Sequence, residues 1–198
     1  MPFDPSQLPA DLPVPVDDGA AAHLPGTAMP PIALPSTSGT PVRVDEVPDG
    51  FSRLVLYAYP MTGLPGVPVP DGWDEIPGAR GCTPETCGFR DHAAELAALG
   101  AAVAGLSTQS TGYQQEAADR LHLTFPLLSD ADLALTGALR LPTFDIELGP
   151  AYEGGGHRTL LKRITLVVNG GLIEKVFYPI FPPDRHAEEV LIWMGAQA

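Results

Sequence analysis

Basic residues are scarce in this chain. It has 11 Lys+Arg against 24 Asp+Glu, a formal net charge of −13. Without a basic patch to neutralise phosphates, we expect no binding to nucleic acid or to anionic membranes. Long apolar runs are also absent, since none approaches the ~20 residues that cross a bilayer. Residues 1–15 lack the basic and apolar regions of a secretory signal. We therefore expect a cytoplasmic protein with no membrane contact.

Cysteine is equally scarce, with only Cys82 and Cys87 in the chain. This number argues against the disulfide framework of a small secreted protein. A structural zinc site usually takes four Cys or His ligands, and the five histidines are scattered. We therefore expect no metal and no other cofactor. Two cysteines five residues apart leave two interpretations, which are small buried apolar residues or a redox pair.

Proline and glycine are abundant but unevenly distributed. Sixteen of the 23 prolines lie in residues 1–77, and none lies between Glu85 and Phe125. The chain is 44% hydrophobic, which excludes disorder throughout. We predict a Pro-rich N-terminal extension over 1–28, as an extended or mobile arm, and a globular domain over 29–198. Residues 61–81 hold five Gly and four Pro, so we predict a long loop of the kind that is often functional.

Hydrophobic periodicity predicts strands that alternate with helices in the middle of the chain. Such alternation favours parallel strand pairing, and a closing hairpin around Asn169-Gly170-Gly171 adds antiparallel strands. The fold class expected is therefore α/β, with a mixed sheet, helices on both faces and a preceding N-terminal β-hairpin. The predicted strands are 32–34, 42–44, 53–59, 102–106, 125–128, 163–168 and 172–178. The predicted helices are 83–100, 112–122, 131–139 and one that begins at 184, and 143–160 is predicted to be a loop.

Cys82 lies where the helix 83–100 is expected to begin, with Thr83 as its N-cap, Pro84 in its first turn and Glu85 as a favourable negative charge near the N-terminus. Free N–H groups and the helix dipole favour an anion there, so we expect a lowered thiol pKa and a nucleophilic thiolate. Residues five apart in an intact helix have Cα atoms about 8–9 Å apart. A disulfide needs at most about 7 Å, so a bond between Cys82 and Cys87 requires the first helical turn to unwind.

The segment Gly81–Asp91, with the sequence GCTPETCGFRD, resembles the active-site helix of the peroxiredoxins. It is most similar to the Q-type, or bacterioferritin-comigratory, subgroup. A weaker resemblance extends from about Pro31 to Trp193 and does not cover residues 1–28. The resemblance implies a thioredoxin-like three-layer sandwich.

The same resemblance implies a role for each cysteine. Cys82 would be the peroxidatic cysteine, which a hydroperoxide oxidises, and Cys87 the resolving cysteine that forms an intramolecular disulfide. Thioredoxin or a similar dithiol would reduce that disulfide, and the protein would be a monomer or a weak dimer. The family also uses an arginine at the start of a late strand to polarise the peroxide. Arg163 matches that position, since Ile164, Thr165 and apolar residues follow it.

The chain departs from the family motif before Cys82. The motif places Pro seven and Thr three residues before the peroxidatic cysteine, where this chain has Glu75 and Ala79. Pro60 ends a strand as the family proline does, which implies an insertion of about fifteen residues. Thr62, two residues after Pro60, is our candidate for the missing hydroxyl. A loop backbone group or a water molecule is the alternative.

Two other functions stay open at this stage. The missing motif threonine favours a thiol–disulfide exchange protein or redox sensor with weak peroxidase activity. A non-enzymatic module that binds partners through the Pro-rich arm is the second alternative. Trp73, in the long loop, either covers the active site or anchors the loop on the body of the protein.

Overall fold

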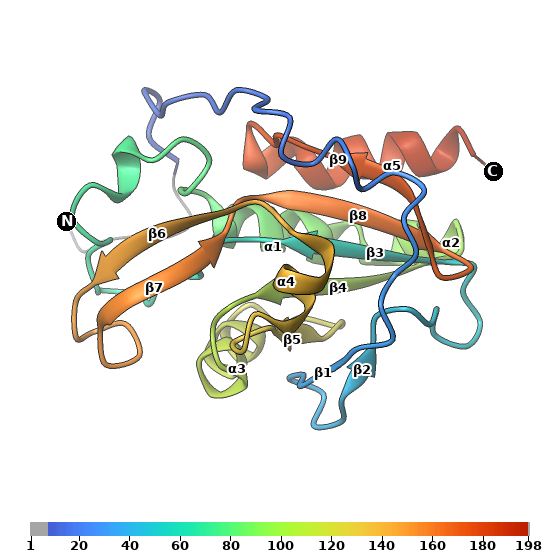
Figure 1. Cartoon of the computed structure of the whole chain (residues 1–198), viewed down its shortest axis with the longest axis horizontal. Helices are drawn as coiled ribbons and strands as arrows, with labels where there is room; N and C mark the ends of the chain where they lie inside the picture. The colour runs from blue at the N-terminus through green and yellow to red at the C-terminus, as the bar shows by residue number, and fades with distance from the viewer. Residues whose placement is uncertain (1–7, 198) are drawn as a thin grey trace.

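A computed structural model describes residues 8–197 of the chain. Its centre is a mixed five-stranded sheet with the order β5-β4-β3-β8-β9 (Figure 1). β3 pairs in parallel with β4, and β4 with β5, while β8 and β9 join as antiparallel strands. The strands are β3 (Arg53–Ala58), β4 (Ala101–Ser107), β5 (Leu127–Ser129), β8 (Ile164–Asn169) and β9 (Leu172–Phe177). The predicted mixed α/β sheet is confirmed.

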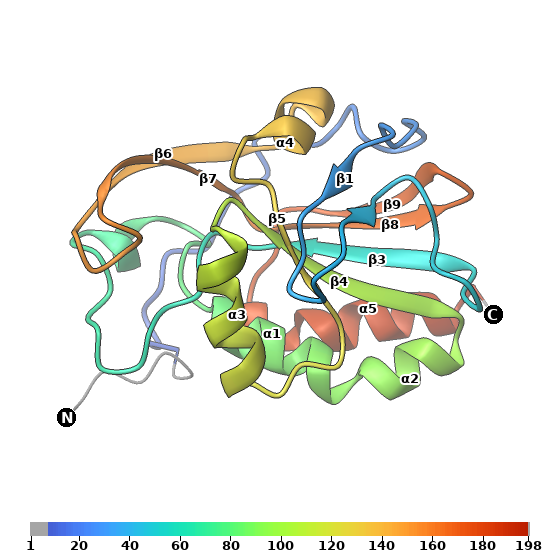
Figure 2. The ribbon, with the colours of Figure 1, turned by 90° about the horizontal axis from the view of Figure 1, so that it is seen from below.

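Helices cover both faces of this sheet (Figure 2). The first face carries α1, α2, α3 and α5, and the opposite face carries α4. The bounds are α1 (Cys82–Asp91), α2 (Ala93–Ala98), α3 (Thr111–Arg120), α4 (Ala134–Leu139) and α5 (His186–Gly195). Short 3-10 turns, η1 (Trp73–Glu75) and η2 (Pro183–Arg185), precede α1 and α5. No helix within residues 8–197 is long and apolar enough to cross a membrane.

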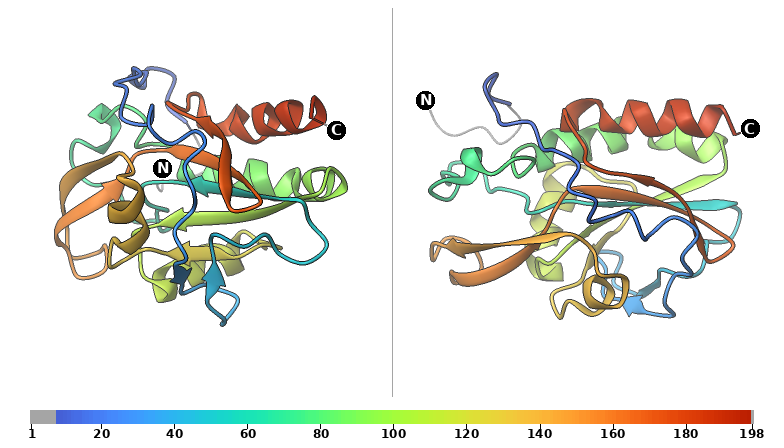
Figure 3. Two further views of the ribbon diagram at one scale, coloured as in Figure 1. Left: turned by 45° about the vertical axis from the view of Figure 1, so that its right-hand side comes forward. Right: turned by 45° about the horizontal axis from the view of Figure 1, so that its top comes forward.

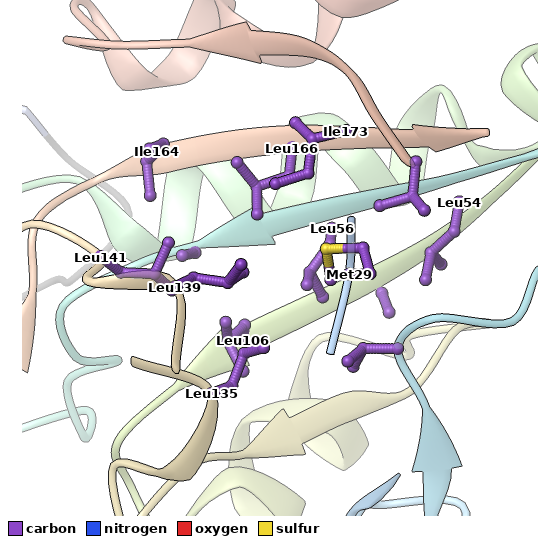
Figure 4. Close-up of a cluster of buried hydrophobic side chains, with 14 of the residues drawn as sticks. Met29, Leu54, Leu56, Leu106, Leu135, Leu139, Leu141, Ile164, Leu166 and Ile173 are labelled. Atoms are coloured by element: carbon purple, nitrogen blue, oxygen red, sulfur yellow. The ribbon is translucent and has the colours of Figure 1, made fainter. Parts of the chain in front are cut away.

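The alternation of side chains along the strands divides the core into two layers. In β3, Leu54 and Leu56 point to the face of α4, whereas Val55 and Tyr57 point to the face of α1 and α5. Figure 4 shows the first of these layers, with Leu106 of β4 and Leu166 of β8 beside the β3 leucines. The central strands are buried on both faces, which explains their continuous apolar sequences.

The N-terminal region differs in part from the prediction. The expected hairpin is present as β1 (Ala33–Leu34) and β2 (Val42–Arg43), which pair antiparallel. The segment before it has no helix or strand within residues 8–28, as expected for an extended arm, but it is packed rather than mobile, because Leu24 is fully buried in the core and the backbone N–H of Gly26 donates to the carbonyl oxygen of Ile173. This segment runs along the central sheet beside β9 (Figure 3). Residues 1–7 lie outside the described part, and a domain boundary after residue 28 stays a prediction.

A second difference concerns residues 143–160, which form a hairpin rather than the predicted loop. Its strands are β6 (Thr143–Leu148) and β7 (Gly156–Leu161), which pair antiparallel along their whole length. The exposed face of the hairpin is charged and its turn is rich in glycine, so the sequence has little strand signal. The hairpin extends past the end of the central sheet at which residues 61–81 lie (Figure 1). The predicted helix 83–100 is also interrupted, at His92, between α1 and α2.

Candidate active site

Cys82 is the first residue of α1, and its side chain is only 4% exposed. The chain enters α1 through Gly81, which has a left-handed φ of 104°. A Cβ atom at Gly81 would lie 2.3 Å from Cγ of Pro183, so only glycine fits this close approach. The N-cap is therefore Gly81, two residues before the predicted N-cap Thr83, and Cys82 is the first helical residue.

Arg163 lies beside Cys82, as predicted from its position in the sequence. It immediately precedes β8, whose first residue Ile164 pairs with the last residue of β3, Ala58. Nη2 of Arg163 lies 3.3 Å from Sγ of Cys82 and donates a hydrogen bond to it. The same nitrogen donates to the carbonyl oxygen of Arg80 at 3.2 Å. The guanidinium is thus held by the backbone that leads into α1, with one side directed at the sulfur.

Glu85 completes a buried group of charges that the sequence analysis did not identify. It lies one turn into α1, is fully buried and accepts a hydrogen bond and ion pair from Nη1 of Arg163. Burial raises the pKa of the Glu85 carboxyl, and the positive charge of Arg163 opposes that rise. In the sequence Glu85 was interpreted only as a favourable charge near a helix N-terminus. Its helical spacing from Cys82 was the signal that could have placed both on the face toward the sheet.

The electrostatics of Cys82 differ from the expectation for a helix N-terminus. Burial raises the pKa of the Cys82 thiol, and the nearby carboxylate of Glu85 adds to that rise. Arg163 and the backbone N–H of Met61 act in the opposite direction and lower this pKa. The net shift of the Cys82 pKa is therefore upward, and the lowered pKa predicted from the helix terminus is wrong, because burial outweighs the groups that favour the thiolate. The charge of Arg163 is the main counterweight to burial.

Cys87 lies on the same uninterrupted helix as Cys82, and both are free thiols. Its side chain is partly buried, which raises the pKa of the Cys87 thiol, while the positive charge of Arg90 opposes that rise. Because α1 is intact from Cys82 to Asp91, the spacing argument applies directly. The two sulfur atoms cannot bond in this conformation without unwinding of the first turn.

Thr62 is fully buried close to the site but is directed to another side chain. Its backbone N–H and its hydroxyl both donate to Oε1 of Gln109, at 2.9 and 3.2 Å. Nε2 of Gln109 returns a hydrogen bond to the carbonyl oxygen of Thr62 at 3.4 Å. Gln109 therefore holds Thr62, while the neighbouring residue Met61 offers its backbone N–H to Cys82.

The entrance to Cys82 is a narrow pocket formed by loop 61–81 and the β6–β7 hairpin. Trp73 is almost fully buried, and its ring lies 6.1 Å from that of Phe144 in β6. Trp73 both anchors the loop on the hairpin and lines the pocket, so the two interpretations of this residue are compatible. The pocket is lined by Met61, Gly63, Val69, Pro70, Trp73, Arg80, Gly81, Cys82, Thr83 and Tyr152.

Comparisons with known proteins agree with this arrangement. Residues 24–191 match the Redoxin family. The chain is 28% identical to peroxiredoxin Bcp of Escherichia coli (strain K12), over 87% of this chain and 96% of that protein. It is 30% identical to a protein of Mycobacterium tuberculosis (strain CDC 1551 / Oshkosh) named as a peroxiredoxin, over 86% and 96% of the two chains.

Solved structures show the same fold. Peroxidoxin BcpB of Mycobacterium tuberculosis superimposes with a TM-score of 0.64 at 27% identity, covering 89% of this chain and 99% of that one. Peroxiredoxin Q of Xanthomonas campestris has a TM-score of 0.60 at 21% identity, covering 94% and 98%. The thioredoxin-like sandwich predicted for the chain is thereby confirmed. The chain belongs to the Redoxin family, as a peroxiredoxin of the Bcp and Q type, and is a peroxidase of the oxidoreductase class.

Proposed function

We propose that Cys82 is the peroxidatic cysteine of a two-cysteine cycle. The Cys82 thiolate attacks the terminal oxygen of a hydroperoxide, the O–O bond breaks, and the leaving oxygen takes up a proton as water or an alcohol. Cys82 is left as a sulfenic acid. The Cys87 thiol then attacks that sulfur, which forms the disulfide and releases water. Thioredoxin or a similar dithiol reduces the disulfide and is itself oxidised.

The observation that carries this proposal is the contact of 3.3 Å between Arg163 and the Cys82 sulfur in a buried site. A guanidinium there favours the thiolate over the thiol, which counteracts the effect of burial. As charge moves from sulfur to the departing oxygen, fixed N–H donors beside the reaction centre stabilise the transition state without reorganising. Arg163 therefore has both roles, towards the thiolate and towards the peroxide.

The disulfide step involves local unwinding of α1. Its second turn contains Gly88, a poor helix former, directly after Cys87. Opening the first turn would break the contact between Arg163 and Cys82. Peroxide reduction and disulfide formation thus use different conformations of the same segment.

Thr62 is retained in the proposal as a hydroxyl donor to the peroxide. Its hydroxyl donates to Gln109 in the described structure, so a contact with peroxide would replace that hydrogen bond. Thr62→Ala removes the hydroxyl, and Thr108→Ala serves as the matched control, because the Thr108 hydroxyl donates to the backbone of Thr159 on the hairpin. A Thr62→Ala protein with the full peroxidase rate would remove Thr62 from the mechanism.

The cycle as a whole is tested by peroxide consumption coupled to thioredoxin, thioredoxin reductase and NADPH. We expect turnover by the wild type, none by Cys82→Ser and a strongly reduced rate by Cys87→Ser. Stopped-flow oxidation of the reduced protein separates the main alternative, a thiol–disulfide exchanger or redox sensor. Oxidation of Cys82 by peroxide at a rate no faster than that of a free thiol would favour the alternative. Efficient exchange of disulfides with other proteins, together with such slow oxidation, would support it further.

We also infer that the protein works in the cytoplasm, as a monomer or a weak dimer. A cycle that starts from two free thiols suits a reducing compartment. Sedimentation of the reduced and disulfide forms over a range of concentrations tests the oligomeric state. A stable, concentration-independent dimer would contradict it.

A further inference from the structure

Two segments that lie far apart in the sequence meet above Cys82. The first is loop 61–81, and the second is the turn between β6 and β7, which contains Tyr152. The hydroxyl of Tyr152 donates to the carbonyl oxygen of Pro68, which ties the turn to the loop. Figure 3 shows the loop and the hairpin side by side at one end of the molecule. They share a buried cluster made of Met61, Trp73, Ala79, Leu148, Tyr152 and Leu160.

These segments supply most of the apolar residues that line the pocket over Cys82, while Arg80 and Thr83 are its polar lining residues. Met61, Val69, Trp73 and Tyr152 supply carbon surfaces around the entrance. Cys82, the first residue of α1, also lines this pocket. Because Cys82 is only 4% exposed, a substrate must pass between these side chains to reach it.

The turn that carries Tyr152 is also fixed from its other side. The backbone N–H of Ser110, at the start of α3, donates to the carboxylate of Glu153 at 3.1 Å. The amide of Gly155 donates to the carbonyl oxygen of Tyr152 at 2.9 Å, within the turn. Tyr152 is therefore held through its side-chain hydroxyl and through its backbone. These contacts fix the position of its ring at the pocket.

We propose that Tyr152, together with Trp73, determines which hydroperoxides this enzyme reduces. A slender, unbranched alkyl hydroperoxide fits between the apolar walls and gains contact with them. A tertiary or aryl hydroperoxide is too wide to bring its terminal oxygen to Cys82. Hydrogen peroxide is small enough to reach Cys82 but has no alkyl group that could contact the apolar side chains. This specificity rests on the proposed peroxidase cycle and adds a substrate class to it.

The test compares hydrogen peroxide, n-butyl hydroperoxide and cumene hydroperoxide by stopped-flow oxidation of Cys82. In the wild type we expect n-butyl hydroperoxide to match or exceed hydrogen peroxide, and cumene hydroperoxide to react at least tenfold more slowly. Tyr152→Ala should raise the ratio of cumene to hydrogen peroxide rates at least tenfold. Tyr152→Phe keeps the ring and should leave the wild-type order of the three substrates.

Tyr113→Ala is the matched control, since Tyr113 packs on the same cluster but does not line the pocket over Cys82. An equal rise in the ratio for Tyr113→Ala, or no rise for Tyr152→Ala, would overturn the proposal. If Tyr152→Ala does not fold, Tyr152→Leu takes its place. We then expect a smaller rise in the ratio of the cumene hydroperoxide rate to the hydrogen peroxide rate, and an unchanged ratio would again contradict the proposal. Failure of the peroxidase cycle itself has a different signature, namely slow oxidation of the wild type by all three peroxides.

Discussion

The electrostatic role of Arg163 leads to a quantitative prediction for Arg163→Gln. The guanidinium lies 3.3 Å from the Cys82 sulfur, and full unit charges at that distance interact by about 5 kcal/mol at an effective dielectric constant of about 20. Arg163 also forms an ion pair with Glu85, so we assign about half of this interaction energy to the Cys82 thiolate. About 2.5 kcal/mol corresponds to a change of roughly 100-fold in the equilibrium between thiol and thiolate. The substitution should therefore raise the pKa of the Cys82 thiol and lower its thiolate fraction at neutral pH by about that factor.

The sign of the pH dependence follows from the charge that is removed. A thiol with a higher pKa has a smaller thiolate fraction at every pH below that pKa, by about tenfold per unit. At neutral pH the variant should therefore react about 100-fold more slowly. At pH values above both pKa values, the curves of wild type and variant should converge. Glu85→Gln removes a negative charge near the sulfur and should shift the curve toward lower pH.

The assay is the rate of iodoacetamide alkylation of Cys82 as a function of pH, in a Cys87→Ser background. The double variant Arg163→Gln/Glu85→Gln is the control, because Arg163→Gln alone leaves the buried Glu85 carboxylate without its positively charged partner. Circular dichroism verifies that each variant is folded. An Arg163→Gln protein with the wild-type thiol pKa would refute the argument, since burial would then be balanced by another group.

Three further predictions concern the fold and the cycle. Leu24→Ala should lower the free energy of unfolding by about 2–5 kcal/mol in urea denaturation, because Leu24 is fully buried, and a change near zero would show that its segment is dispensable. Gly81→Ala should lower both stability and peroxide reactivity, since its Cβ would collide with Pro183 and its φ is 104°, and a wild-type rate would contradict this. Cys87→Ser should accumulate a sulfenic acid that dimedone labels, and absence of labelling would argue against its resolving role.

The predictable parts of this protein have strong local signals. Continuous apolar runs predicted the central strands, and their burial on both faces explains why the signal was clear. The N-cap of α1 was predicted to within two residues, at Thr83 rather than at Gly81. Arg163 was identified through the family resemblance, as an arginine at the start of a late strand, and the structure places its guanidinium next to Cys82.

The parts that were not predicted depend on contacts between distant segments. Leu24 lies in a Pro-rich stretch without periodicity, and its burial results from backbone pairing of residues 26–29 with 171–173. Glu85 had an adequate local explanation as a first-turn acid, which concealed its pairing with Arg163. The lowered pKa expected for Cys82 considered the helix terminus and omitted burial, because burial is a property of the whole fold.

The pocket over Cys82 shows how two segments with turn-rich sequences become ordered. Loop 61–81 and the turn of the β6–β7 hairpin are both rich in residues that favour turns, so each was predicted to be a loop. In the structure they bury Trp73 and Tyr152 against each other, and the hydrogen bond from Tyr152 to Pro68 joins them. Each segment therefore supplies the apolar surface on which the other becomes ordered. Residues of both segments line the pocket that contains Cys82, which is why substrate width is the property we expect them to control.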